Sequence, residues 1–135
     1  MRVRLVLLRS LAAAAALCLH GTGYAQSWEP VADSDTALYL IDRSSLVPAG
    51  GRVSGWVLVT GPQGTRLPDY GSRTQLMVFD CGARALALKA YEVYARPGGQ
   101  GALLHTETYD EAALEFTPTS AESVGEKLLE AACSR

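Results

Sequence analysis

Histidine is scarce in this sequence, and its scarcity restricts the catalytic chemistry that we expect. The chain has two histidines, and only His105 lies beyond the first 25 residues. A Ser-His-Asp or Cys-His arrangement would need His105, which stands in the strand-like run 103–107, where a solvent-facing side chain is the simpler interpretation. A zinc site would have to combine it with carboxylates alone. We therefore predict a non-enzymatic protein with no catalytic residues, no metal site and no cofactor.

Sequence motifs that would indicate a phosphate, metal or small-molecule site are also missing. The glycine-containing segment 61–66 lacks the Gly-Lys-Ser/Thr ending of a phosphate-binding loop. The acidic clusters Asp110-Glu111 and Asp33-Ser34-Asp35 lie in predicted loops, where carboxylates are usually solvated turn residues rather than acid/base catalysts or calcium ligands. No polar cluster indicates a pocket for a small molecule or a lipid.

Positive charge is sparse as well. The formal net charge is −2, and it becomes more negative if the N-terminal segment with Arg2, Arg4 and Arg9 is removed. No basic stripe interrupts this acidic balance, and only Lys89 and Lys127 supply lysine. An acidic surface repels phosphate groups, so nucleic acid and anionic lipid surfaces are excluded as expected partners.

Long apolar runs are missing too, but the N-terminus has the layout of an export signal. Basic residues precede the apolar run 11–19, and small residues follow at Gly23 and Ala25. The run is far shorter than the roughly 20 residues that a membrane-spanning helix needs. We predict a secretory signal peptide over residues 1–25, no transmembrane anchor, and a location in the periplasm or at the outer cell surface. Cys18 is preceded by Leu17, which argues against lipid attachment there.

Cleavage after Ala25 would leave two of the three cysteines, Cys81 and Cys133. An even number of cysteines in an exported domain usually forms disulfides. We therefore predict a Cys81–Cys133 bridge, which would destabilise the unfolded chain by roughly 4 kcal/mol in the loop-closure model. Two free thiols or a metal pair are the competing interpretation, and no further ligands support them.

The remaining residues, 26–135, are predicted to form a single α+β domain. Apolar alternation predicts strands at 37–42, 52–60, 74–81, 83–95 and 102–109, with a weaker candidate at 114–117. Turn-forming glycine and proline separate them at 48–51, 61–64 and 97–101. These connections are too short for crossover helices, so we expect a mostly antiparallel sheet of five to six strands.

One helix is predicted at the C-terminus. Thr119 can cap its first turn, and Glu122 can reach back to the backbone N–H of Thr119. An apolar stripe follows at helical spacing, made of Val124, Leu128, Leu129, Ala131 and Ala132. Because Cys133 lies at the edge of this stripe, the stripe and the disulfide predict the same docking of the helix onto one face of the sheet.

Residue parity then identifies a second apolar face. If Cys81 bonds Cys133, then Met77 and Phe79 share its helix side, and Leu76 and Val78 point the other way. The neighbouring strand is also apolar on both sides. The candidate partner-binding residues are Leu76, Val78, Trp56 and Val57. One helix cannot cover both faces, so loops and the segment around Trp28, a second copy in a homodimer, or another protein must cover the second.

The order and spacing of these features resembles the surface-adhesin protein E family of exported bacterial proteins. The features span Trp28 to Cys133: Trp28, the run 37–42, Val53-Ser54-Gly55-Trp56-Val57-Leu58-Val59, Tyr70-Gly71-Ser72, Phe79-Asp80-Cys81, the alternating run after it and the terminal helix. The resemblance implies an antiparallel sheet with a disulfide-linked C-terminal helix. It also implies a protein-binding function at the cell surface, toward host extracellular-matrix or serum proteins, and it implies dimers.

Two functions follow as expectations. The first is an exported protein-binding module of the bacterial envelope, an adhesin that uses a sheet face, a sheet edge or the loops 61–71 and 97–101. The second is a periplasmic structural or accessory subunit that acts through self-association. The scarcity of lysine and the lack of a lipid-attachment signal are departures from what a surface-anchored adhesin needs.

Overall fold

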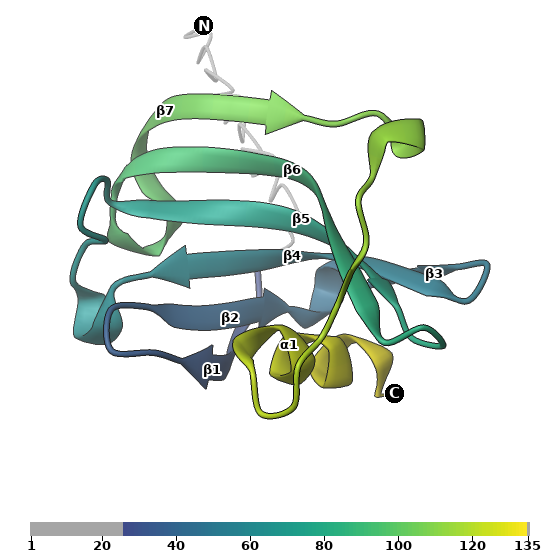
Figure 1. The fold of residues 1–135 in the computed structure, drawn as a ribbon. Helices are drawn as coiled ribbons and strands as arrows, with labels where there is room; N and C mark the ends of the chain where they lie inside the picture. The colour runs from purple at the N-terminus through teal and green to yellow at the C-terminus, as the bar shows by residue number, and fades with distance from the viewer. Residues whose placement is uncertain (1–25, 135) are drawn as a thin grey trace, which may run out of the picture.

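The computed structural model describes residues 26–134. The predicted signal peptide, residues 1–25, lies outside these described residues. The fold is one curved antiparallel sheet with a single α-helix packed against one of its faces (Figure 1). The predicted α+β architecture with a mostly antiparallel sheet is thus confirmed.

Eight strands form the sheet, and their spatial order is β1-β2-β4-β5-β6-β7, with β3 beside β4 and β8 beside β6. All pairings are antiparallel. The strands are β1 (Trp28–Asp33), β2 (Leu38–Asp42), β3 (Val47–Ala49), β4 (Arg52–Thr60), β5 (Ser72–Asp80), β6 (Ala85–Arg96), β7 (Gln100–Thr108) and β8 (Thr117–Pro118). Short 3-10 turns lie between them: η1 (Arg43–Ser45), η2 (Pro62–Gly64), η3 (Pro97–Gly99) and η4 (Glu111–Ala113). The helix α1 (Val124–Cys133) ends the described chain.

The five main predicted strands are present, the weaker candidate 114–117 overlaps β8 only at Thr117, and two further strands, β1 and β3, were not predicted. β1 contains Pro30 and a register shift between Pro30 and Ala32, so its side chains do not alternate in the regular way that marks a strand. β3 has three exposed residues and includes Pro48, which removes the apolar signal. Sheet pairing stabilises both segments where the local sequence gives little indication.

The core lies between the sheet and α1. Phe79, Ile41 and Val57 are fully buried on the sheet side, and they meet Leu129 and Ala132 of the helix. The predicted apolar stripe therefore packs where the parity of β5 placed it. Burying large apolar side chains in this layer is the main favourable term in the stability of the domain.

The helix begins one turn later than predicted. The prediction placed the cap at Thr119, but the N-cap is Ser123, whose Oγ accepts a hydrogen bond from the backbone N–H of Glu126 at 3.1 Å. The carboxylate of Glu126 also accepts a hydrogen bond at 2.8 Å from the N–H of Glu122, the residue before the cap. Thr119 instead donates its hydroxyl to the carbonyl of Arg84 at 3.2 Å, and its backbone N–H donates to the same carbonyl. The start at Thr119 was wrong because that residue continues the β8 pairing.

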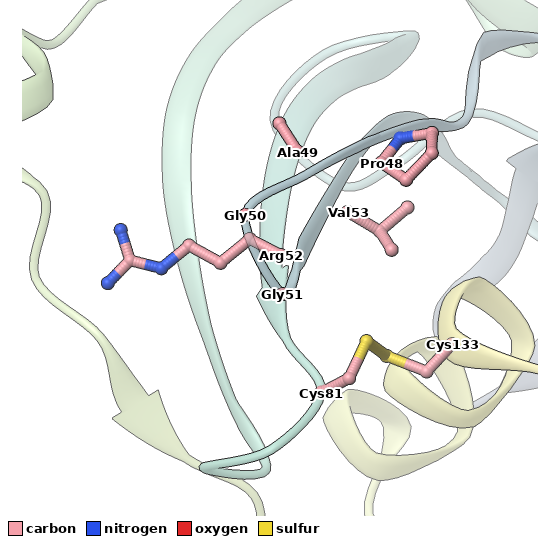
Figure 2. Close-up of a pocket in the computed structure, with 8 residues that line it drawn as sticks. All are labelled: Pro48, Ala49, Gly50, Gly51, Arg52, Val53, Cys81 and Cys133. Atoms are coloured by element: carbon pink, nitrogen blue, oxygen red, sulfur yellow. A yellow bond between two sulfur atoms is a disulfide. The ribbon is translucent and has the colours of Figure 1, made fainter.

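The Cys81–Cys133 disulfide is confirmed. It joins the end of α1 to the residue after β5, with the two Cα atoms 5.8 Å apart. Figure 2 shows the bridge beneath the β3–β4 hairpin, and a cavity of about 360 Å³ separates the hairpin from the sulfur atoms. The helix is also tied to the sheet by polar contacts, because Arg43 donates to the carbonyl of Ala131 at 3.1 Å and pairs with Glu29. The Arg84 guanidinium meets Glu126 at 2.7 Å.

Candidate functional site

The face of the sheet that points away from α1, which we call the second face, contains three of the four predicted partner-binding residues. Trp56 pairs with Leu76 across β4 and β5, and Val78 follows two residues later on the same side. Val57 lies elsewhere: it belongs to the core beneath α1 and is 0% exposed. The structure thus brings Trp56, Leu76 and Val78 together and leaves Val57 out.

The turn η3 covers one end of the second face. Its Gly98 N–H donates to the hydroxyl of Thr60 at 3.0 Å, and its Gly99 N–H donates to that of Ser72 at 2.7 Å. Ser72 in turn donates to the carbonyl of Arg96 at 2.6 Å. These bonds hold the β6–β7 turn over Leu58, which is 3% exposed, so this part of the second face is closed from within the chain.

The opposite end of the second face is also partly closed. Val78 is 7% exposed and lies beside a small cavity that Lys89 and Glu111 line. These two residues form an ion pair across that end. The guanidinium of Arg52 stacks over the ring of Phe116 at 4.2 Å, a favourable cation–π contact. Between the two closed ends, Trp56 and Leu76 remain half-buried.

A cavity of about 250 Å³ occupies the middle of the second face. Its lining includes both tryptophans of the chain, together with residues of β5, β6 and η3. The lining residues are Gln26, Trp28, Trp56, Thr74, Glu92, Tyr94 and Gly99. From the sequence, the segment around Trp28 was expected only to cover the second face, and Glu92 and Tyr94 were not predicted as site residues. Their shared parity on β6 was the available signal, but strand order was needed to place them opposite β5.

Electrostatically, this cavity contains one carboxylate held by neighbouring hydroxyls. Glu92 accepts hydrogen bonds from the Tyr94 hydroxyl at 2.5 Å and from the Thr74 hydroxyl at 3.3 Å. The bond to Glu92, followed by partial burial, raises the pKa of Tyr94 above its usual 10.0. The tyrosine therefore stays protonated at neutral pH and keeps donating to the carboxylate.

The free edge of the sheet is the second candidate for binding. β7 closes the strand order at one end, and every residue of it is exposed. Its Leu103 and Leu104 are 53% and 57% exposed. The other edge is better protected, since β1 contains Pro30 and Glu29 and lies next to α1 (Figure 1). An exposed edge with unpaired backbone groups can accept another strand.

The single histidine beyond the predicted signal peptide lies on the surface of the sheet. His105 lies on β7 with its side chain 54% exposed, and its nearest acidic neighbour, Glu107, is 3.5 Å away on the same strand. Over residues 26–134, no group of three His, Cys, Asp or Glu side chains is placed to hold a metal ion. The helix described here is too short and too polar to cross a membrane.

The chain is similar to known proteins in its fold and in its sequence profile. No curated protein matches the sequence. The solved structure of crystal form II of Haemophilus influenzae protein E is similar to this chain, with a TM-score of 0.52 and 15% sequence identity, over 81% of this chain and 95% of that one. At that identity the likeness concerns the fold. The family profile described as surface-adhesin protein E matches residues 28–134, and because this match spans most of the sequence, the chain belongs to the surface-adhesin protein E family.

Proposed function

We propose that this protein is an exported, non-enzymatic binding module of the bacterial envelope that holds host extracellular-matrix or serum proteins by adding one of their strands to β7. Family membership supports a surface adhesin-type protein. The observation that carries the finer proposal is the complete exposure of β7 at a free sheet edge.

The physical basis is the unpaired backbone along β7. Its outer N–H and C=O groups can form a ladder with an extended peptide, and side-chain contacts then provide specificity. The outward-lying Leu103 and Leu104 add apolar surface to such a contact. Edge strands of monomeric proteins are usually protected by charges or proline, but β7 has Glu107 as its single acidic residue and contains no lysine, arginine or proline.

The partner surface can continue from this edge onto the second face. Trp56 and Leu76 are half-buried there, and the sheet from β4 to β7 connects them to the edge. Val78 contributes less surface because it is already buried. We therefore assign the strand-to-strand contact to β7 and a supporting apolar contact to Trp56 and Leu76.

Export is part of the same proposal. The signal peptide over residues 1–25 delivers the chain to an oxidising compartment, which agrees with the Cys81–Cys133 bridge. Mass spectrometry of the protein recovered from the periplasm or medium tests this, since we expect a mature N-terminus at Gln26. A retained N-terminus, or a mass that includes lipid on Cys18, would contradict it.

A binding assay with matched variants tests the use of β7. The double variant Leu103→Glu, Leu104→Glu places two like charges on the exposed strand. Val47→Glu is the control, because Val47 is as exposed as Leu104, at 57%, but lies on β3. We expect saturable binding of the oxidised protein to immobilised matrix or serum proteins, loss of it in the double variant and retention in the control.

The alternative is a periplasmic accessory subunit that self-associates. The same open edge favours it, since two copies of β7 could pair with each other. Size-exclusion chromatography with light scattering separates the two functions. A dimer that the double variant dissociates, in a protein that binds no matrix or serum protein, favours the accessory subunit. A monomer whose binding depends on β7 favours the adhesin.

A further inference from the structure

We propose that the cavity of the second face binds an alkylammonium cation of the trimethylammonium type. The cavity measures about 250 Å³, enough for a small cationic head group. The residues that line it include Trp28, Trp56 and Tyr94 together with Glu92. Aromatic side chains around one acidic group are the usual recognition chemistry for quaternary ammonium.

The register of the sheet places these groups on one side. Thr74 pairs with Leu58 of β4 on one flank and with Glu92 of β6 on the other. Ser72 pairs with Tyr94 in the next row. Directly paired residues in an antiparallel sheet share a face, so Glu92 and Tyr94 lie on the same face as Trp56 and Leu76. Trp28 arrives from β1 at the other side of β2, and Gly99 of η3 forms part of the rim.

Glu92 provides a negative charge that two hydroxyl groups hold in place. The hydroxyls of Tyr94 and Thr74 both donate to its Oε2 atom, which orients the carboxylate. Among the ion pairs formed within residues 26–134, none involves Glu92. A bound cation would supply a countercharge, in competition with the α-amino group that cleavage after Ala25 creates at Gln26 in the same lining.

The polar groups of the cavity favour a methylated ammonium over other ligands. Lysine ammonium and arginine guanidinium carry several N–H donors, which lose their water on entry and need acceptors in return. Glu92 is the one carboxylate of the lining, and two hydroxyl donors already engage it. A trimethylammonium group has no N–H to satisfy and is weakly hydrated, so ring faces and one carboxylate suffice. An anion would be repelled by Glu92.

Intrinsic tryptophan fluorescence gives a direct assay. The chain has two tryptophans, and both line this cavity, so the emission reports on the proposed site alone. The oxidised, exported protein is titrated with choline chloride at constant ionic strength. The matched probe is the neutral tert-butyl isostere of choline, which has the same shape without the charge. We expect a saturable change with choline and about tenfold or more weaker binding of the isostere.

Two variants and one control connect this signal to the cavity. Glu92→Gln should weaken choline binding by about tenfold or more and leave the isostere unaffected. Trp28→Leu, on the edge strand β1, should weaken both. Glu107→Gln removes one carboxylate from exposed β7 and should change neither. Thermal melts verify that each variant is folded, and a folded Glu92→Gln that binds choline like the parent would overturn the proposal.

The source of the cation is decided by further probes. Co-sedimentation with phosphatidylcholine but not phosphatidylglycerol vesicles would assign a displayed choline head group, whereas binding of free choline without vesicle binding would assign a small solute. Either result supports the site. The absence of a saturable change with choline, equal affinity for the isostere, or tighter binding of lysine amide than of choline would overturn it. None of these results depends on β7, so this test and the adhesin test fail independently.

Discussion

The face of the sheet that receives α1 and the second face differ in what closes them. The helix side is closed by large apolar side chains that exclude water, including Phe79, Ile41 and Leu129. The second face is closed by a turn, hydroxyl hydrogen bonds and ion pairs, and its middle keeps a cavity. Apolar burial contributes most of the stability of a small domain. The polar groups that close the second face can instead give up a contact within the chain and bind a ligand.

The contrast assigns stability to one face and binding to the other. The disulfide, the capped helix and the Arg43 contacts all lie on the helix side. The second face and its continuation to β7 hold both tryptophans and the exposed leucines. Substitutions on the two sides should therefore separate loss of folding from loss of binding.

Phe79→Ala should be the most damaging substitution. Phe79 is 0% exposed in the layer between β5 and α1, so its removal leaves a cavity and should lower the free energy of unfolding by about 3–5 kcal/mol. Leu104→Ala on β7 is the matched comparison and should change stability by no more than about 0.5 kcal/mol. Urea denaturation of the oxidised proteins measures both values. Equal losses at the two positions would break the division between the faces.

Cys133→Ser should follow in size. The bridge spans a sequence separation of 52 residues, and loss of such a cross-link costs about 2–4 kcal/mol, mainly through the larger freedom of the unfolded chain. Thermal and urea unfolding of parent and variant give the difference. Reductant should lower the stability of the parent to that of the variant and leave the variant unchanged. An identical melting temperature in the two proteins would show that the apolar stripe alone holds α1.

Ser123→Ala tests the start of the helix. Its Oγ accepts from the N–H of Glu126, and loss of an N-cap of this kind costs about 1 kcal/mol. Thr119→Ala removes one hydrogen bond to the Arg84 carbonyl, while the backbone bond there remains. Urea denaturation should therefore show the larger loss for Ser123→Ala. The reverse order would return the helix start to Thr119.

The first residue of α1 could not be predicted from the local sequence. Thr119 with Glu122 and Ser123 with Glu126 have the same Ser/Thr-x-x-Glu spacing, which is the sequence signature of a helix start in both cases. Pairing of β8 with Ala85 and Leu86 decides it, because Thr119 then bonds Arg84. The stripe itself was predictable because helical periodicity is local.

The strands and the cavity show the same difference between local patterns, which the sequence reveals, and long-range pairing, which it does not. Parity within β5 separated Met77 and Phe79 from Leu76 and Val78 correctly, since alternation is a property of one strand. The cavity of the second face is lined by Trp28 of β1 and Trp56 of β4, whose strands are separated by β2, and by Glu92 of β6. Long-range pairing brings these residues together, and no local pattern encodes it. Val57 illustrates the same limit, because its two-sided strand did not say which apolar side faced α1.

The smallest expected effect is on how the stability of the protein depends on pH, through Glu126. The hydrogen bond from Arg84, followed by the backbone N–H of Glu122, lowers the pKa of Glu126 below its usual 4.5. A carboxylate with a lowered pKa in the folded state contributes stability above its unfolded pKa and loses it as the pH falls through the folded value. Glu126→Gln should therefore be less stable than the parent near neutral pH, and the difference should shrink below about pH 4.5. The glutamine oxygen can still accept from Glu122, so the variant removes the charge and the bond from Arg84 and keeps the bond from Glu122.

Arg84→Gln supplies the control for this charge effect. It removes the partner guanidinium, which also lies 3.6 Å from Glu130, and leaves the carboxylate of Glu126 in place. Urea denaturation of both single variants and the double variant, at neutral and at acid pH, should show a coupling that is present at neutral pH and lost in acid. Since the pair is solvent-exposed, salt should weaken the coupling. A coupling that persists at acid pH would place the stabilisation in packing along Arg84 rather than in the ion pair, and would then assign this contact to the apolar layer of the helix side.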